Sequence, residues 1–151
     1  NKEIQESIEK YFSGAVMGRD AESSIFYALD ELGFTAENTL FTDSSCPDEI
    51  NHDDPEEDVT SLFAKRWGEV FPLGGLAGLP FTGKTGWGAF TSHVPQPDGN
   101  IVILFAPHVG IDAKGNVGMI HRFGQKGDSS ACGASIGALK ALQKDKSAGD
   151  M

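Results

Sequence analysis

The sequence predicts a single α/β domain over residues 1–151. Two observations support this fold class. Segments with apolar residues at helical spacing alternate with short apolar runs typical of buried strands, and 151 residues with 39% apolar content suit one compact domain with its own core. Every apolar run is well short of the roughly eighteen residues that a membrane helix requires, so we expect no membrane partner.

Two segments near the N-terminus and one in the middle predict helices. Apolar side chains recur at helical spacing over residues 4–12 and again over residues 25–32. Gly33 then marks the end of the second helix. A third helix is predicted from Pro55 to Trp67, because proline suits the first turn of a helix and apolar residues follow it at helical spacing.

Two apolar runs predict buried strands, at residues 38–42 and 101–106. The first runs into a polar turn at residues 43–48, which contains Cys46. The second ends at Pro107, directly before His108. Because α/β folds gather their sites at the carboxyl ends of strands, Cys46 and His108 stand where a site is expected.

The last third of the chain predicts a hairpin strand and a helix. A turn at residues 112–116 leads into residues 117–123, which we interpret as a hairpin partner strand. Three residues suited to helix N-caps, at 128–130, then precede a helix expected over about residues 131–143. Cys132 falls in the first turn of that helix.

Residues 68–100 are rich in glycine and proline and predict loops with at most short strands, which makes them a candidate wall for a binding pocket. Residues 78–85 within them fit the phosphate-binding P-loop pattern letter for letter. A P-loop lies between a strand and a helix, and we expect the glycines and proline after residue 85 to prevent that helix. Nucleotide hydrolysis is therefore disfavoured.

The charge balance argues against nucleic acid as a partner. Twenty-two acidic residues outnumber twelve basic ones, so the net charge at pH 7 is −10. Such a charge repels the phosphate backbone of nucleic acids and anionic membrane surfaces alike. Since the acidic excess lies in residues 1–75, an anionic substrate would meet the second half of the chain.

Cys46, His108 and Cys132 form a candidate zinc site. A helix N-terminus lowers the pKa of a nearby thiol and favours the thiolate that zinc binds, which suits Cys132. Two cysteines and one histidine would leave a fourth coordination position open, as in catalytic zinc sites.

The same residues allow other interpretations. The two cysteines could be buried core thiols or could form a disulfide. For the histidine ligand, the sequence alone leaves competing candidates at His52, His93 and His121.

Five segments carry a family resemblance: SCPDEIN at 45–51, FTGKTGWGAF at 81–90, SHVP at 92–95, FAPHVGI at 105–111 and CGA at 132–134. Together they resemble the limiting-CO2-inducible protein B family of algae, also described as a Cys-Gly-His-rich domain and, in diatoms, as theta-carbonic anhydrases. The resemblance implies a sheet flanked by helices similar to β-class carbonic anhydrases, a homodimer, and a Zn²⁺ ion held by Cys46, His108 and Cys132. It also implies a chloroplast protein of the CO2-concentrating mechanism, in the stroma, pyrenoid or thylakoid lumen.

The resemblance places Asp48 beside the metal, where an arginine would hold its carboxylate away from the fourth position. The β-class pattern has that arginine two residues after the aspartate and a cysteine three residues after the histidine. This chain has Ile50 and Ile111 there. The arginine must therefore be Arg19, Arg66 or Arg122, of which we choose Arg66, and the second thiol must be the distant Cys132.

The implied activity is that of a zinc lyase: the reversible hydration of carbon dioxide to bicarbonate by a zinc-bound hydroxide, in support of photosynthesis. Asp48 or His93 would pass the released proton to buffer. Candidate apolar walls for carbon dioxide are Phe81, Trp87, Phe90 and Val109. The alternative is a homologue that keeps zinc without turnover and acts as a subunit of a larger assembly.

Overall fold

The structure is a computed structural model that describes residues 1–51, 56, 58–68, 70–78 and 83–147. Residue contacts divide the chain into two compact units, Val16–Pro107 and Asn1–Ala15 with His108–Met151. The single domain over residues 1–151 stays a prediction. The described elements, in order, are α1 (Lys2–Tyr11), α2 (Gly18–Glu31), β1 (Thr39–Ser45), the 3-10 turn Glu49–Asn51, α3 (Val59–Trp67), β2 (Phe71–Pro72), the 3-10 turn Leu76–Gly78, α4 (Gly83–Thr91), β3 (Asn100–Ala106), β4 (Met119–Ile120), β5 (Ser129–Ser130) and α5 (Gly133–Ser147).

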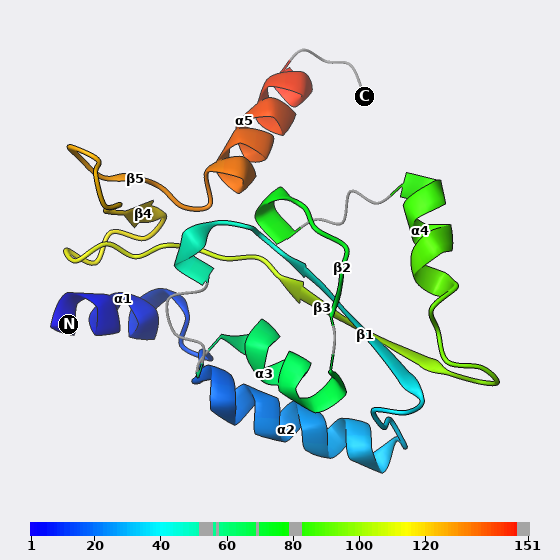
Figure 1. The fold of residues 1–151 in the computed structure, drawn as a ribbon. Coiled ribbons are helices and arrows are strands. Elements are labelled where there is room, and N and C mark those ends of the chain that lie inside the picture. The colour runs from blue at the N-terminus through cyan, green and yellow to red at the C-terminus, as the bar shows by residue number, and fades with distance from the viewer. Residues whose placement is uncertain (52–55, 57, 69, 79–82, 148–151) are drawn as a thin grey trace. The chain divides into compact units, whose positions relative to one another are not determined.

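The larger unit contains a parallel sheet with β1 between β2 and β3 (Figure 1). Strand β1 pairs with β3 along its whole length, from Thr39 opposite Asn100 to Ser45 opposite Ala106. The two strands expected from their apolar runs are therefore confirmed. Because they run parallel and in step, they end at the same edge of the sheet.

Strand β1 continues three residues past its expected end, through a segment predicted as a polar turn. The buried polar side chains toward this end of β1 have hydrogen-bond partners, which removes most of the cost of burying them. The Thr42 hydroxyl donates to the Phe71 carbonyl, and the Ser44 hydroxyl donates toward the carbonyls of Gly74 and Gly78. These partners come from the segment after α3, so the local sequence could not reveal them.

Helices α2 and α3 lie on one face of this sheet (Figure 1). Phe41 of β1 packs with Phe63 and Trp67 of α3, and Phe26 of α2 contacts both α3 rings at 4.9 and 5.1 Å between centroids. Aromatic side chains bury large apolar areas, so this cluster holds the two helices on β1. The expected helices at 25–32 and up to Trp67 are confirmed; the expected start at Pro55 lies outside the described residues.

The expectation that residues after 85 cannot form a helix is wrong, because α4 covers Gly83–Thr91. Burial of Phe90 accounts for it: this ring is fully buried and contacts Phe71 and Trp87 at 5.3 and 5.2 Å. Tertiary packing of that kind outweighs the low helix propensity of glycine. Phe90 is therefore a core residue and not a pocket wall, and Phe81 lies outside the described residues.

The P-loop interpretation still lacks support, because the backbone groups of Gly78, the first glycine of the pattern, already have hydrogen-bond partners within the protein. Gly78 is buried, its N–H donates to the Gly75 carbonyl, and its own carbonyl accepts from Ser44. The backbone groups of a P-loop must instead face the phosphates.

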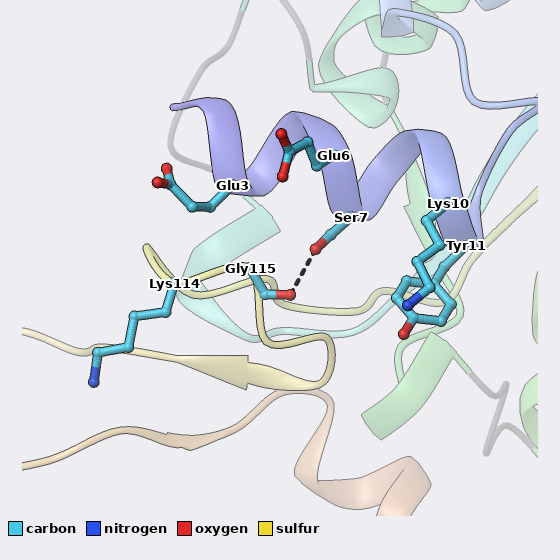
Figure 2. Close-up of a pocket in the computed structure, with 7 residues that line it drawn as sticks. All are labelled: Glu3, Glu6, Ser7, Lys10, Tyr11, Lys114 and Gly115. Carbon is cyan, nitrogen blue, oxygen red and sulfur yellow. Dashed lines mark hydrogen bonds between the residues drawn. The ribbon is translucent and has the colours of Figure 1, made fainter.

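The smaller unit joins α1 to the turn at residues 112–116. Ser7 of α1 donates to the Gly115 carbonyl at 2.6 Å, and the Asn1 amide donates to Ala113 at 2.9 Å; Figure 2 shows the first bond and the side chains of the shallow pocket around it. Gly115 has φ +82°, and a Cβ there would lie 2.8 Å from the Glu3 carbonyl oxygen. Glycine is thus required both for the turn and for the approach of α1.

Downstream of that turn, the expected strand at 117–123 is only partly correct. Ile111 and Val117 form an isolated antiparallel bridge, and β4 pairs antiparallel with β5. Helix α5 begins at Gly133, two residues later than expected, so Cys132 directly precedes it. No helix of the described residues is long and apolar enough to cross a membrane.

Candidate metal centre

Cys46 directly follows the last residue of β1 and is 2% exposed. Its carbonyl accepts a hydrogen bond of 2.6 Å from the Asn51 side chain, which closes the chain back over the end of the strand. The thiol therefore stands in a buried position fixed by the sheet on one side and by this turn on the other.

His108 follows the end of β3 by two residues. Beyond it, the N–H of Gly110 donates to the Ala131 carbonyl at 2.9 Å, and the N–H of Ala131 donates to the Gly118 carbonyl at 3.0 Å. A Cβ on Gly110 would lie 2.9 Å from the carbonyl oxygen of Met119, so only glycine permits this approach. These contacts bring the chain after His108 beside the chain before Cys132.

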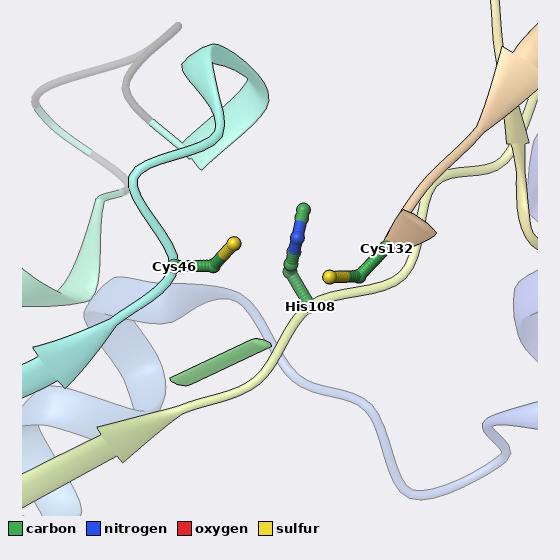
Figure 3. Close-up of side chains that lie close together, drawn as sticks. All are labelled: Cys46, His108 and Cys132. Carbon is green, nitrogen blue, oxygen red and sulfur yellow. The ribbon is translucent and has the colours of Figure 1, made fainter. Parts of the chain in front are cut away.

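The structure brings together the three residues that the sequence selected as metal ligands. The thiol sulfurs of Cys46 and Cys132 and a ring nitrogen of His108 all lie within 4.8 Å of one another, and their side chains point toward each other (Figure 3). The two cysteines are not joined by a disulfide, so that interpretation is not supported.

The donor set fits a zinc ion. Zinc favours thiolate and imidazole ligands in tetrahedral geometry, with bonds of about 2.3 Å to sulfur and about 2.0 Å to nitrogen, so neighbouring donors lie roughly 3.5–3.8 Å apart. Donors that already lie within 4.8 Å need only a small adjustment to reach that spacing. The cluster could therefore bind a metal and leave a fourth position open.

The environment of Cys132 favours its thiolate. Burial acts to raise the pKa of this thiol, but hydrogen bonds from the backbone and hydroxyl of Ser135, from the His108 side chain and from the Ala134 backbone together outweigh it and lower the pKa to about 7. Ser135 and Ala134 belong to the first turn of α5, where backbone N–H groups have no partner within the helix. The helix N-terminus thus acts as the sequence suggested.

We expect the metal-free Cys46→Ser variant to show this shift directly. Its only thiol is Cys132, so thiolate absorbance near 240 nm should rise with a midpoint near pH 7, two units below the ordinary value of 9.0. Replacing Ser135 with alanine removes a hydrogen bond to the thiolate and should move the midpoint upward. A midpoint near 9 in both proteins would contradict the hydrogen-bonding pattern at the start of α5.

The predicted Arg66–Asp48 pair requires correction. The Arg66 guanidinium pairs instead with Asp30 of α2 and stacks over the rings of Phe26 and Trp67. Asp48 lies two residues after Cys46, beside the 3-10 turn. Arg19 and Arg122 are the other candidates that the sequence offers, and Arg122 donates to the Ser129 hydroxyl at 2.6 Å.

The other histidines do not join the cluster. His93 follows α4, is exposed, and has Nδ1 2.8 Å from the Ala89 carbonyl and its ring 5.3 Å from that of Phe71. His121 lies 3.3 Å from Asp128, and His52 lies outside the described residues. Of the described histidines, only His108 stands with the two thiols.

Sequence reasoning missed two residues that shape the site. Ser135 hydrogen-bonds Cys132, and Asn51 fixes the backbone of Cys46. Ser135 carried a detectable signal, since it stands three residues after a cysteine at the start of a predicted helix, the spacing of a first-turn contact. Asn51 lay in an acidic, irregular stretch with no periodicity to mark it.

Comparison with known proteins identifies a family and structures with a similar fold. The family model described as limiting CO2-inducible proteins B/C beta carbonic anhydrases matches residues 15–151. Among solved structures, PtLCIB4, a homologue of the limiting CO2-inducible protein LCIB, is 29% identical with a TM-score of 0.78, over 97% of this chain and 59% of that one. LCIB itself is 26% identical with a TM-score of 0.56, over 70% of this chain and 42% of that one.

The chain thus spans less than two thirds of the length of PtLCIB4. A comparison with curated proteins gives no match. The mixed α/β fold, with a parallel sheet flanked by helices, agrees with the structures of these relatives. Because this family model extends over nearly all of the sequence, the chain belongs to the family described as limiting CO2-inducible proteins B/C beta carbonic anhydrases.

Proposed function

We propose that this chain is an active carbonic anhydrase, which binds Zn²⁺ through Cys46, His108 and Cys132 and interconverts carbon dioxide and bicarbonate. The cluster of two thiols and one imidazole within 4.8 Å carries the proposal, since that donor set with one open position is typical of catalytic zinc. Membership in a family named for carbonic anhydrases supports it. The proposal extends to a homodimer in the chloroplast that supports photosynthetic carbon supply.

When bound, zinc supplies acidified water as the nucleophile at neutral pH. The chain contributes the surroundings. Cys46 and Cys132 are 2% and 4% exposed, so the ligand atoms are shielded from bulk water and their thiolates act in a medium where charge interactions are strong. The hydrogen bonds at the start of α5 lower the pKa of Cys132. Its thiol therefore loses its proton at a low free-energy cost when a cation binds.

Asp48 is assigned the proton and gating chemistry. Two residues after Cys46, its carboxylate can accept a proton or occupy the fourth position, and an arginine that pairs with it would prevent the second outcome. Arg19 or Arg122 takes that role in this proposal, since Arg66 is engaged with Asp30. His93 is exposed, so its ring can exchange a proton with buffer.

A second candidate is a zinc-binding subunit without turnover. Two observations favour it: Ile50 stands where the β-class pattern has an arginine, and Arg66 is engaged by Asp30. In such a protein the metal would have a structural role, and the chain would act as a subunit of a larger assembly.

Metal analysis with a stopped-flow hydration assay separates the two. The enzyme should contain one zinc per chain and hydrate carbon dioxide above the uncatalysed rate; chelation should abolish this rate, and added zinc should restore it. Zinc at one per chain with only the uncatalysed rate would establish the inert subunit instead. A chain that binds no zinc would contradict both proposals.

A further inference from the structure

Ser44 connects the central strand to a glycine-rich turn. It lies in β1, two residues before Cys46, and is fully buried. Its hydroxyl lies 3.0 Å from the carbonyl oxygen of Gly78 and 3.2 Å from that of Gly74, so its single proton is shared between them. The turn Gly74–Gly78 is thereby fastened to the end of β1 that leads into Cys46.

The same turn presses against the end of β3. A Cβ on Gly78 would lie 2.9 Å from the backbone nitrogen of Pro107 and 3.0 Å from the carbonyl carbon and oxygen of Ala106. These are backbone atoms, which cannot rotate away as a flexible side chain would. Gly78 also has φ +74°, a conformation that residues with a side chain rarely adopt. Its position therefore demands glycine on two grounds.

We infer that the turn Gly74–Gly78 is a positioning element for the metal ligands, a role that rests on the proposed zinc function. It touches β1 through Ser44 and the end of β3 through Gly78, and these strands continue into Cys46 and His108. The two strand ends already pair with each other, up to Ser45 opposite Ala106, and the turn adds a second constraint on their positions. This constraint bears on ligand spacing, because Cys46 directly follows β1 and only Pro107 separates β3 from His108.

The start of the turn is hydrogen-bonded to the sheet through the edge strand β2, so the turn has a fixed position relative to the ends of β1 and β3. The N–H of Leu73 donates to the Asp43 carbonyl at 2.8 Å, which continues the pairing of β2 with β1 up to the start of the turn. A displaced turn would thus have to break sheet hydrogen bonds or move the strand end. Residues that orient metal ligands from outside the coordination sphere typically change metal affinity by about 10–100-fold.

Two variants test the inference against a matched control. Gly78→Ala places a methyl group against Ala106 and Pro107, and Ser44→Ala removes the hydroxyl that holds the turn. Gly74→Ala is the control, because Gly74 belongs to the same turn and also has a positive φ, of +63°, but a Cβ there meets no atom within 4 Å. Both glycine variants thus introduce backbone strain, but only Gly78→Ala also introduces a clash with Ala106 and Pro107.

Zinc affinity is measured by competition with a chromogenic chelator, and Co²⁺ in place of zinc reports ligand geometry through the intensity of its visible absorption bands. We expect Gly78→Ala and Ser44→Ala to lower zinc affinity about 10–100-fold and to weaken the bands at saturating Co²⁺. Gly74→Ala should stay within about threefold of wild type.

Each other outcome overturns the inference. Wild-type affinity and Co²⁺ bands in Gly78→Ala and Ser44→Ala would do so while leaving the proposed function intact. An equal loss in Gly74→Ala would mean general destabilisation. If Gly78→Ala does not fold, Ser44→Ala decides alone, and an affinity within threefold of wild type rejects the role. A wild-type chain that binds no zinc rejects the proposed function together with this inference.

Discussion

Replacement of Cys46 by alanine is expected to lower zinc affinity by at least about a hundredfold and to abolish carbon dioxide hydration. Structural zinc sites with four protein ligands gain roughly 10–16 kcal/mol, or about 3 kcal/mol per ligand, and a tenfold change in affinity corresponds to about 1.4 kcal/mol. Alanine leaves only His108 and Cys132 to hold the ion. Cys46 is buried beside both of them, so its loss removes a donor from the interior of the cluster.

Thr39→Ala is the matched control. Thr39 is 4% exposed and lies in the same strand, at the end away from Cys46, so the variant removes a buried side chain of comparable size without touching the ligands. It should keep one zinc per chain and wild-type hydration. Metal content, competition affinity and stopped-flow rates are compared for the three proteins under reducing conditions. Full zinc content in Cys46→Ala would remove that residue from the ligand set.

The meeting of Cys46, His108 and Cys132 could be predicted because each of the three residues carried a local signal. Cys46 and His108 followed apolar runs that mark strand ends, and Cys132 preceded a capped amphipathic segment. Parallel pairing then places strand ends at one edge, so the strand assignments nearly determine the meeting point of Cys46 and His108. The family resemblance selected His108 among the four histidines.

The arginine partner could not be predicted, because its neighbours are set by helix packing. Arg66 stacks on Trp67, its neighbour in sequence, but also on Phe26, forty residues earlier in α2, and pairs with Asp30 of the same helix. Nothing in the spacing around Arg66 indicates that α2 crosses α3 there. The correction follows from tertiary contacts alone.

The errors in the elements have a similar origin. The sequence does not predict helix α4, because its glycines argue against a helix, whereas burial of Phe90 against Phe71 stabilises it. The sequence ends strand β1 too early, because Ser44 is suited to a turn, whereas a carbonyl 34 residues away satisfies its hydroxyl. Helix and strand propensities describe an isolated segment. In both cases a contact with a residue distant in sequence outweighs the local propensity.

Phe63→Ala is expected to destabilise the protein by about 3–5 kcal/mol, the usual effect of truncating a buried phenylalanine. Phe63 is 2% exposed and its ring contacts those of Phe26, Phe41 and Trp67, so alanine would leave a cavity at the centre of the aromatic cluster. Domains of this size are stable by roughly 5–15 kcal/mol, so this loss removes a large share of the total. Urea unfolding measures it as a lower midpoint with an unchanged slope.

Tyr27→Ala is the control for this variant. Tyr27 is an aromatic residue of α2 that is 69% exposed, so its loss should change stability by less than about 0.5 kcal/mol. A similar effect of both variants would contradict the assignment of the core. Zinc provides an independent check: Phe63 lies in the core and not at the ligands, so saturating zinc should raise the stability of wild type and of Phe63→Ala by the same increment. A smaller increment in Phe63→Ala would mean that the packing of α3 on β1 also sets the position of Cys46, at the end of that strand.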